Sequence, residues 1–226
     1  MSHVTGVSPG RMLGRRQLVV ALAFVMVCLV TMPASATAFS DSFNRSAGAL
    51  GSPWTTANST WGVRSNRAKV LTAQYAAGIG YAVRPFVSTN FTVSADITLS
   101  PTYRRANAGL TLLFVSHANN IYCKIEVTPG NPNGLMSIGR RRGGVTTSLL
   151  AKIRNTGFMN GRTYKVACGR TGNVIRMTVG TLSITYTLTA DDIAAFGSAT
   201  NVGLRCHSTS DEDDGLSTYD NFSAVT

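Results

Sequence analysis

Residues 91–99 read FTVSADITL, and apolar side chains occupy every second position of this stretch. Residues 121–127 (IYCKIEV) and 182–188 (LSITYTL) repeat the same alternation. Successive side chains of an extended strand point to opposite faces, so a period of two is typical of a strand with one buried face. The three stretches therefore predict half-buried β-strands.

Turn signals separate further strands along the chain. Gly180-Thr181, Gly143-Gly144 and Thr171-Gly172-Asn173 are short turn signals, and residues 129–134 form a longer loop. More strands are expected near 62–71, 79–84, 109–116, 135–141, 146–153, 162–168, 174–179, 202–206 and 218–224. Short, regularly spaced strands predict an all-β fold, a single antiparallel two-sheet β-sandwich (jelly roll) with at most one short connector helix.

That helix is expected directly after Thr189, which can act as its N-cap. Asp191 and Asp192 suit the positive end of a helix dipole, and Gly197 can end the helix. The segment is long enough for about two turns, so we expect a connector rather than a core helix.

The first 38 residues have the features of a cleaved secretory signal peptide. They contain three arginines and no acid, and residues 18–32 form a run of fifteen uncharged residues that is followed by two overlapping A-x-A sites. The run is shorter than a membrane-spanning helix requires. Arg15-Arg16 also fits a twin-arginine signal. We therefore expect secretion by a bacterium, through the Sec or the twin-arginine route, and a domain of residues 39–226 with no membrane span after cleavage.

The charge balance of the chain favours acidic partners outside the cell. The 226 residues include 21 Lys and Arg against 10 Asp and Glu, for a net charge of +11. Without the three arginines of residues 1–38, 18 Lys and Arg remain against 10 Asp and Glu, which gives a net charge of +8. An exported basic protein suits carbohydrate or an acidic envelope polymer better than nucleic acid, which we do not expect as a partner. The alternative is that the charge serves solubility alone. A monomer is expected.

Segments at both ends of the domain carry a family resemblance. The first runs from Asp41 to Trp54 (DSFNRSAGALGSPW) and continues with STWGV at 59–63. The second comprises VGLR at 202–205 and YDNF at 219–222. This pattern resembles the concanavalin A-like lectin/glucanase superfamily, in its laminin G-like jelly-roll branch as found in secreted actinobacterial and phage tail proteins. The resemblance implies one curved sheet, adjacent terminal strands, and sugar sites on the concave face or its rim.

Catalytic motifs of related enzymes are missing from the sequence. Glycoside hydrolysis normally needs two carboxylates beside the scissile bond, and related glucanases carry a Glu-x-Asp-x-x-Glu run. The chain has only two glutamates, Glu126 and Glu212. These observations favour a non-catalytic, lectin-like module over a polysaccharide-cleaving enzyme of the same fold. A structural or adhesion module of a surface assembly is a further alternative.

Two strands provide candidate ligand-binding residues. The expected outward-facing side chains are Tyr122, Lys124 and Glu126 on one strand, and Arg205 and His207 on another. If both strands belong to the curved sheet, an aromatic ring and charged groups could line a sugar groove. The alternative is an ordinary solvated sheet face.

A structural calcium ion is implied by the resemblance, because relatives of this fold often hold one between terminal strands. Asp41 and Asp220 are the candidate ligands, and the acidic run 211–214 could contribute. The alternative is that these are surface acids beside turns.

Three cysteines remain after cleavage: Cys123, Cys168 and Cys206. Export permits one disulfide among three possible pairings, and each cysteine is also compatible with a buried thiol. Trp61 is expected in the core rather than in a sugar platform.

Overall fold

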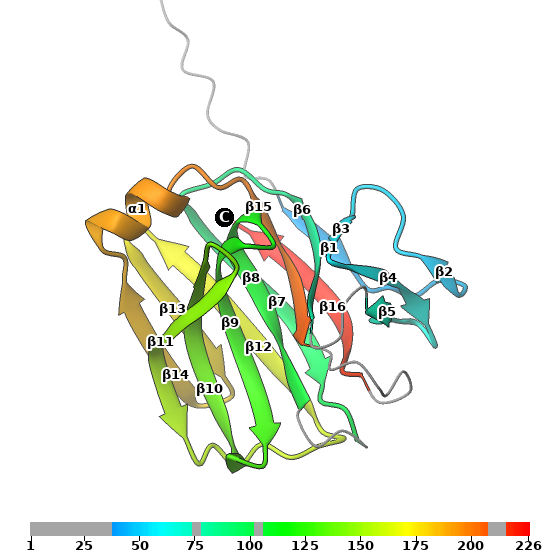
Figure 1. Ribbon diagram of the computed structural model, residues 1–226. Coiled ribbons are helices and arrows are strands. Elements are labelled where there is room, and N and C mark those ends of the chain that lie inside the picture. Colours follow the sequence, from blue (N-terminus) through cyan, green and yellow to red (C-terminus); the bar gives the residue numbers. More distant parts are fainter. Residues whose placement is uncertain (1–37, 74–77, 102–105, 208–215) are drawn as a thin grey trace, which may run out of the picture. The chain divides into compact units, whose positions relative to one another are not determined.

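The computed structural model describes residues 38–73, 78–101, 106–207 and 216–226 (Figure 1). The predicted signal peptide, apart from residue 38, and the acidic run 211–214 lie outside the described residues. Within those residues, no helix is long and apolar enough to cross a bilayer.

Two antiparallel sheets form a β-sandwich in the described residues, as predicted. Sheet A has the order β14 (Leu182–Thr187), β13 (Val174–Val179), β12 (Thr163–Thr171), β7 (Asn90–Thr98), β16 (Thr218–Val225), β5 (Arg67–Ala73), β4 (Ser59–Arg64) and β2 (Gly48–Ala49), and β1 (Phe39–Asp41) also pairs with β16. Sheet B has the order β11 (Val145–Arg154), β10 (Asn131–Arg142), β9 (Asn119–Thr128), β8 (Ala106–Ser116), β15 (Asn201–His207), β6 (Ile79–Pro85) and β3 (Thr55–Ala57).

The core lies between the two sheets and is built from alternate residues of their strands. Phe91, Val93, Ala95 and Ile97 of β7, together with Leu99 directly after it, are all buried, as the alternation predicted. Burying the apolar side of each strand is the main driving force for this arrangement. Trp61 is in the core as well.

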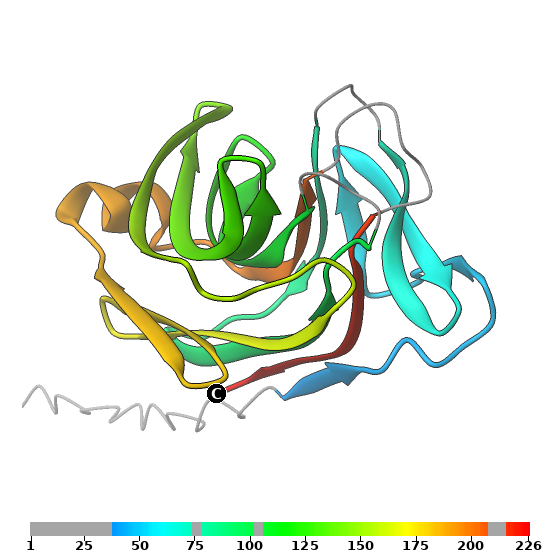
Figure 2. The ribbon, with the colours of Figure 1, turned by 90° about the horizontal axis from the view of Figure 1, so that it is seen from below.

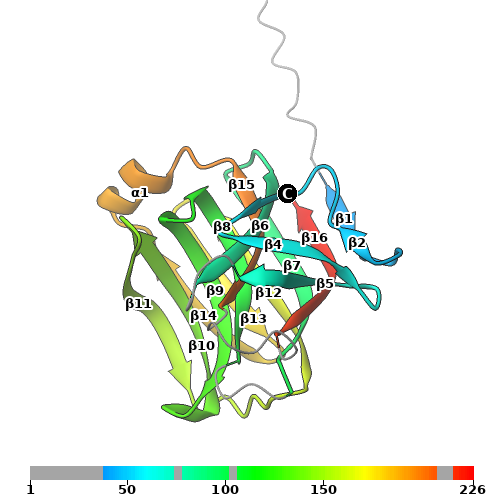
Figure 3. The same ribbon diagram turned by 45° about the vertical axis from the view of Figure 1, so that its right-hand side comes forward.

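Sheet B is the more strongly curved layer. Figure 2 shows its green strands bending away from the flatter yellow and gold strands of sheet A, so that sheet B is concave on its outer side. The terminal strands β1 and β16 lie side by side, with Asp41 opposite Phe222, as the family resemblance implied (Figure 3).

The stretch 62–71, predicted as one strand, is a hairpin of β4 and β5. Ser65 and Asn66 both have positive φ, the backbone conformation of a tight two-residue hairpin turn. One continuous strand would place Val63 and Ala68 on opposite faces, because five positions separate them. The turn pairs these two residues and buries both in the core.

The short helix α1 (Ala190–Phe196) begins as predicted. Thr189 is its N-cap, and its hydroxyl and the Asp192 side chain form a capping box. The carboxylate of Asp192 is also bonded to Arg140 of β10 and to the hydroxyl of Tyr186 on β14. This fully buried carboxylate therefore ties the helix to both sheets.

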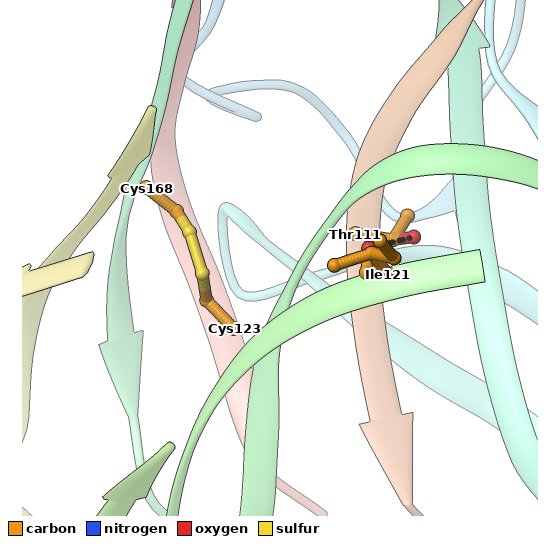
Figure 4. The surroundings of a disulfide bond; sticks show 4 residues. All are labelled: Thr111, Ile121, Cys123 and Cys168. Atoms are coloured by element: carbon orange, nitrogen blue, oxygen red, sulfur yellow. Dashed lines mark hydrogen bonds between the residues drawn. A yellow bond between two sulfur atoms is a disulfide. The ribbon is translucent and has the colours of Figure 1, made fainter. Parts of the chain in front are cut away.

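A disulfide joins the two sheets through Cys123 of β9 and Cys168 of β12 (Figure 4). Their Cα atoms are 6.4 Å apart, and 45 positions separate them in the sequence. Cys206 is a free, buried thiol, and burial raises its pKa to about 11. Of the three pairings that the sequence allowed, this is the one that the fold brings together.

Removing the disulfide should destabilise the domain substantially. Closing a loop of this length restricts the unfolded chain, and we expect the double variant Cys123→Ala/Cys168→Ala to lose about 4 kcal/mol of unfolding free energy. Urea denaturation measures this loss. Chemical reduction of the disulfide should lower the unfolding free energy of the wild type by a comparable amount. The same treatment should leave the unfolding free energy of the double variant unchanged. Equal stability of oxidised wild type and double variant would contradict the bridge.

The Asp192 carboxylate should make stability depend on pH. Burial by itself raises the pKa of Asp192, but hydrogen bonds from Tyr186, Arg140 and Thr189 outweigh it and hold the pKa below the usual value. A depressed pKa contributes stability above the pKa of the unfolded chain, and this stability is lost as the pH falls through the folded value. At neutral pH, Asp192→Asn should cost about 3 kcal/mol, because it removes the buried charge that Arg140 and Tyr186 contact.

Between about pH 5 and about pH 2, the wild type should then lose more stability than Asp192→Asn does. Urea midpoints at several pH values measure both losses. The control is Asp191→Asn, on the exposed side of the same helix. Parallel losses in wild type and Asp192→Asn would show that this carboxylate does not carry the effect.

Candidate functional site

All five predicted ligand-binding residues lie on sheet B. Tyr122, Lys124 and Glu126 belong to β9, while Arg205 and His207 belong to β15, and β8 lies between these two strands. Their neighbours in the sequence point into the core, so these side chains are on the side of sheet B that faces away from sheet A. We call this side the outer face.

The strand register aligns the outer-face residues in rows across the sheet. One row crosses five strands and contains Lys152, Ser137, Lys124, Gly109 and Arg205. The next row contains Arg154, Leu135, Glu126 and Asn107. Residues 5 to 98 positions apart in the sequence are thereby brought into hydrogen-bonding distance.

Glu126 is the centre of a hydrogen-bond network on this face. Lys124 forms an ion pair with its carboxylate. Asn107 donates from Nδ2 to Glu126 Oε2 over 3.0 Å, and Asn131 donates from Nδ2 to Oε1 over 3.1 Å. Arg205 in turn donates from Nη1 to Asn107 Oδ1 over 2.8 Å. Arg205 also contacts Tyr122. Four of the five predicted residues, all except His207, therefore lie in one contiguous cluster.

The contact between Arg205 and Tyr122 is a cation–π interaction. The Arg205 Cζ atom lies 4.2 Å from the centroid of the Tyr122 ring. From the other side of the sheet, Tyr219 donates its hydroxyl hydrogen to the Arg205 carbonyl oxygen. Burial, which outweighs the opposing effect of Arg205, raises the pKa of Tyr122. Arg205 is thus held by three contacts: Tyr219 bonds its carbonyl oxygen, and Asn107 and the Tyr122 ring contact its guanidinium.

The expectation of an ordinary solvated face is wrong. The exposed fractions of Tyr122, Lys124, Glu126 and Arg205 are 0%, 8%, 6% and 2%. On a sheet curved toward its outer side, neighbouring side chains crowd together and shield one another from water. Burial is accordingly the main reason that the pKa of Lys124 is lowered, and the nearby Arg205 lowers it further.

Three glycines lie where this face has no space for a further side chain. Gly109, Gly139 and Gly203 all lie on its outer side. A Cβ atom at Gly139 would lie only 2.5 Å from the Tyr122 ring. At Gly109 and Gly203, the Cβ atom would meet the backbone of the neighbouring strand.

An open pocket of about 330 Å³ lies at one end of the network. Glu126, Asn107 and His207 line it together with residues 128–130 of the β9–β10 turn. Pockets that bind small molecules have volumes of roughly 300–1,000 Å³, so this one suits a small unit such as one or two sugar rings. Glu126 and His207 reach the pocket, whereas the buried Tyr122 and Arg205 do not line it, and Arg205 supports it through its hydrogen bond to Asn107.

Asn107 and Asn131 are site residues that the sequence analysis missed. Asn107 lies on β8, where the alternation is less regular, and Asn131 lies in a stretch predicted as a loop, although β10 begins there. The alternation on β8 counted back from Leu110 could have placed Asn107 beside Glu126. No signal in the sequence pointed to Asn131.

The candidate calcium ligands have other partners in the structure. Both oxygens of Asp41 accept hydrogen bonds from Arg45, over 2.7 and 3.1 Å, and further bonds come from Trp54 Nε1 and the Phe43 amide. Asp220 accepts a bond from the Asn221 amide. A guanidinium thus occupies the place of a cation at Asp41, and these residues as placed do not form a calcium-ligand set. Calcium binding stays a prediction.

A second hollow, of about 460 Å³, lies on the outer face of sheet A. It is lined mainly by threonines and by the small residues Ala167 and Gly169. Its one charged lining residue, Arg176, donates to Ser183 on the neighbouring strand. This hollow lacks the converging polar groups of the sheet B pocket.

Comparisons with known proteins identify the fold. No protein-family model matches the chain, and no curated protein matches its sequence. Among solved structures, the carbohydrate-binding module CBM66 from Bacillus subtilis matches with a TM-score of 0.59 and 14% identity, over 76% of this chain and 95% of that one. The CBM2 module of the evolved Dit protein of Lactobacillus casei BL23 phage J-1 matches with a TM-score of 0.58 and 9% identity, over 84% and 96%.

The GH43 protein BlXynB from Bacillus licheniformis also matches, with a TM-score of 0.59 and 13% identity, over 82% of this chain and 39% of that one. At these identities the likeness concerns the fold alone. The chain has a β-sandwich of the type found in carbohydrate-binding modules, which is consistent with the concanavalin A-like resemblance.

Substituting Gly139 should test how tightly the outer face is packed. Gly139→Ala must displace the buried Tyr122 ring, and we expect a loss of about 1–3 kcal/mol of unfolding free energy. Urea denaturation and near-UV circular dichroism measure the effect. The control is Gly130→Ala, where a Cβ atom would meet nothing within 4 Å. An unchanged Gly139→Ala variant would mean that the ring has room to move.

Proposed function

We propose that this chain is a secreted, non-catalytic carbohydrate-binding module, whose ligand enters the pocket on the outer face of sheet B. The observation that carries the proposal is the convergence of Glu126, Asn107 and His207 on one open pocket, above a buried and hydrogen-bonded floor. Few, well-placed polar groups in a concave site are the usual means of orienting a small ligand. The laminin G-like affiliation, cleavage after residue 38 and a monomeric state belong to the same proposal.

Two further observations support it. The fold is shared with proteins described as carbohydrate-binding modules, CBM66 and the CBM2 module of a phage Dit protein. The features of a signal peptide at residues 1–38 suit a partner outside the cell.

The geometry of Glu126 favours binding over hydrolysis. A general acid must deliver a proton to the glycosidic oxygen, whereas both oxygens of Glu126 already accept hydrogen bonds, from three donors. Hydrolysis also normally needs a second carboxylate within about 10 Å. On the outer-face part of sheet B that the structure describes, Glu126 is the one carboxylate.

A binding measurement tests the proposal directly. The mature domain should bind at least one member of a glycan array that includes cell-wall polymers, and calorimetry should then give its affinity. We expect His207→Ala to weaken binding by about tenfold or more, since it removes a polar contact worth about 1–2 kcal/mol. Glu126→Gln should also weaken binding, because it removes the charge that holds Lys124, Asn107 and Asn131 in place around the pocket. The control is Thr178→Ala, in the hollow on sheet A.

Failure to bind any glycan, in a protein shown to be folded by circular dichroism, would count against the proposal. A reducing-end assay on the same polysaccharides separates it from the main alternative, a polysaccharide-cleaving enzyme. Turnover that Glu126→Gln abolishes would establish the enzyme instead. Co-purification of a protein partner without sugar would favour a structural or adhesion module.

A further inference from the structure

Positive charge gathers on the outer face of sheet B. In the described residues, this face carries one carboxylate, Glu126, and five lysine or arginine side chains: Lys124, Arg141, Lys152, Arg154 and Arg205. The five positive charges exceed the single negative charge of Glu126 by four. Lys152 and Arg154 are exposed at the open β11 edge of the sheet, and Arg141 is half-buried.

The main hydrogen-bond acceptors of this face are already used by its own donors. Lys124, Asn107 and Asn131 occupy the oxygens of Glu126. Arg205 donates to the side-chain oxygen of Asn107, and Arg154 donates to that of Asn131. A ligand that mainly donates hydrogen bonds would therefore find few side-chain acceptors open to it.

Donors on the same face are in surplus. The Nε atoms of Arg205 and Arg141 and the hydroxyl groups of Tyr122 and Ser137 are buried without a hydrogen-bond partner among the described residues. Two of these residues are cationic, and Lys124 lies in the register row of Ser137 and Arg205. Charges sheltered from water are screened weakly by solvent and salt, so the buried cations reinforce the field of the exposed ones.

We propose that this face selects acidic glycans, that is, polysaccharides that carry carboxylate or sulfate groups. The oxyanions lie against Lys152 and Arg154 at the open β11 edge and against Arg141 on the adjacent strand β10, and the adjoining sugar ring occupies the pocket at Glu126 and His207. This inference rests on the proposed carbohydrate binding and adds the charge class of the ligand and the residues that select it. Charge complementarity of this kind mainly determines specificity and association rate.

The test compares two forms of one polysaccharide. Polygalacturonate and its methyl ester share a backbone but differ in charge, so their affinities isolate the carboxylate. We expect polygalacturonate to bind about tenfold tighter or better, with an advantage that shrinks as salt is added. Dextran sulfate against dextran is the second pair. Preference for the anionic member in either pair supports the inference, and comparison of the pairs separates carboxylate from sulfate.

A matched pair of variants separates this face from the net charge of the protein. Lys152→Gln/Arg154→Gln removes two exposed cations from the outer face of sheet B, and Lys165→Gln/Arg176→Gln removes two from the outer face of sheet A. Both variants change the net charge equally. The first should weaken binding of the anionic glycan about five- to tenfold, since exposed charges contribute up to about 1 kcal/mol each. The second should leave the affinity unchanged.

Four outcomes would overturn the inference. Equal affinity for the neutral and anionic members of both pairs would remove the charge preference while leaving carbohydrate binding intact. Equal weakening by the two variants, or equally tight binding of single-stranded DNA, would reduce the effect to nonspecific attraction of polyanions. Failure to bind every glycan would overturn the proposed function together with the inference.

Discussion

The opposite orientation of successive residues in β9 is the constraint on which both the core and the candidate site depend. Ile121, Cys123 and Ile125 fill the space between the sheets, and Tyr122, Lys124 and Glu126 lie on the outer face. A shift of one residue in register would exchange the two sets and place an ion pair in the apolar core. The apolar half of the strand therefore holds the polar half in position, and the same register aligns Glu126 with Asn107 of β8.

Burial of charge on the outer face is costly, and the network offsets that cost. A charge removed from water needs a partner and hydrogen bonds to remain stable. Lys124 and Glu126 neutralise each other, and the two asparagines satisfy the remaining carboxylate positions. Arg205 has no carboxylate partner of its own in this cluster. Its guanidinium is held instead by the Asn107 oxygen and the Tyr122 ring, so its positive charge is left uncompensated there.

The alternation of apolar residues was sufficient to predict the sandwich, its main strands and the outward orientation of the five candidate residues on two strands. Whether those two strands share a sheet was left open. The alternation could not predict their burial, because burial depends on the curvature of sheet B and on glycines in other strands. The hairpin at Ser65 and Asn66 was missed because apolar residues alternate in both of its strands, so the stretch was predicted as one continuous strand. The contacts of Asn131 and Arg154 could not be predicted from the sequence for another reason. Their contacts with the site follow from the register of three strands, which a local pattern does not specify.

The disulfide bears on the geometry of the candidate site as well as on the stability of the domain. Cys123 lies between Tyr122 and Lys124 on β9, so its bond to β12 anchors the strand directly behind the floor of the site. A site built on rigid strands loses little conformational freedom when its ligand binds, and less binding energy is spent on ordering side chains. The buried ion pair and the Arg205–Tyr122 contact act in the same direction, because they hold long side chains in one rotamer before any ligand arrives. Rigidity of this kind suits recognition of a fixed pattern of charge, in which each oxyanion must meet a cation that is already in place.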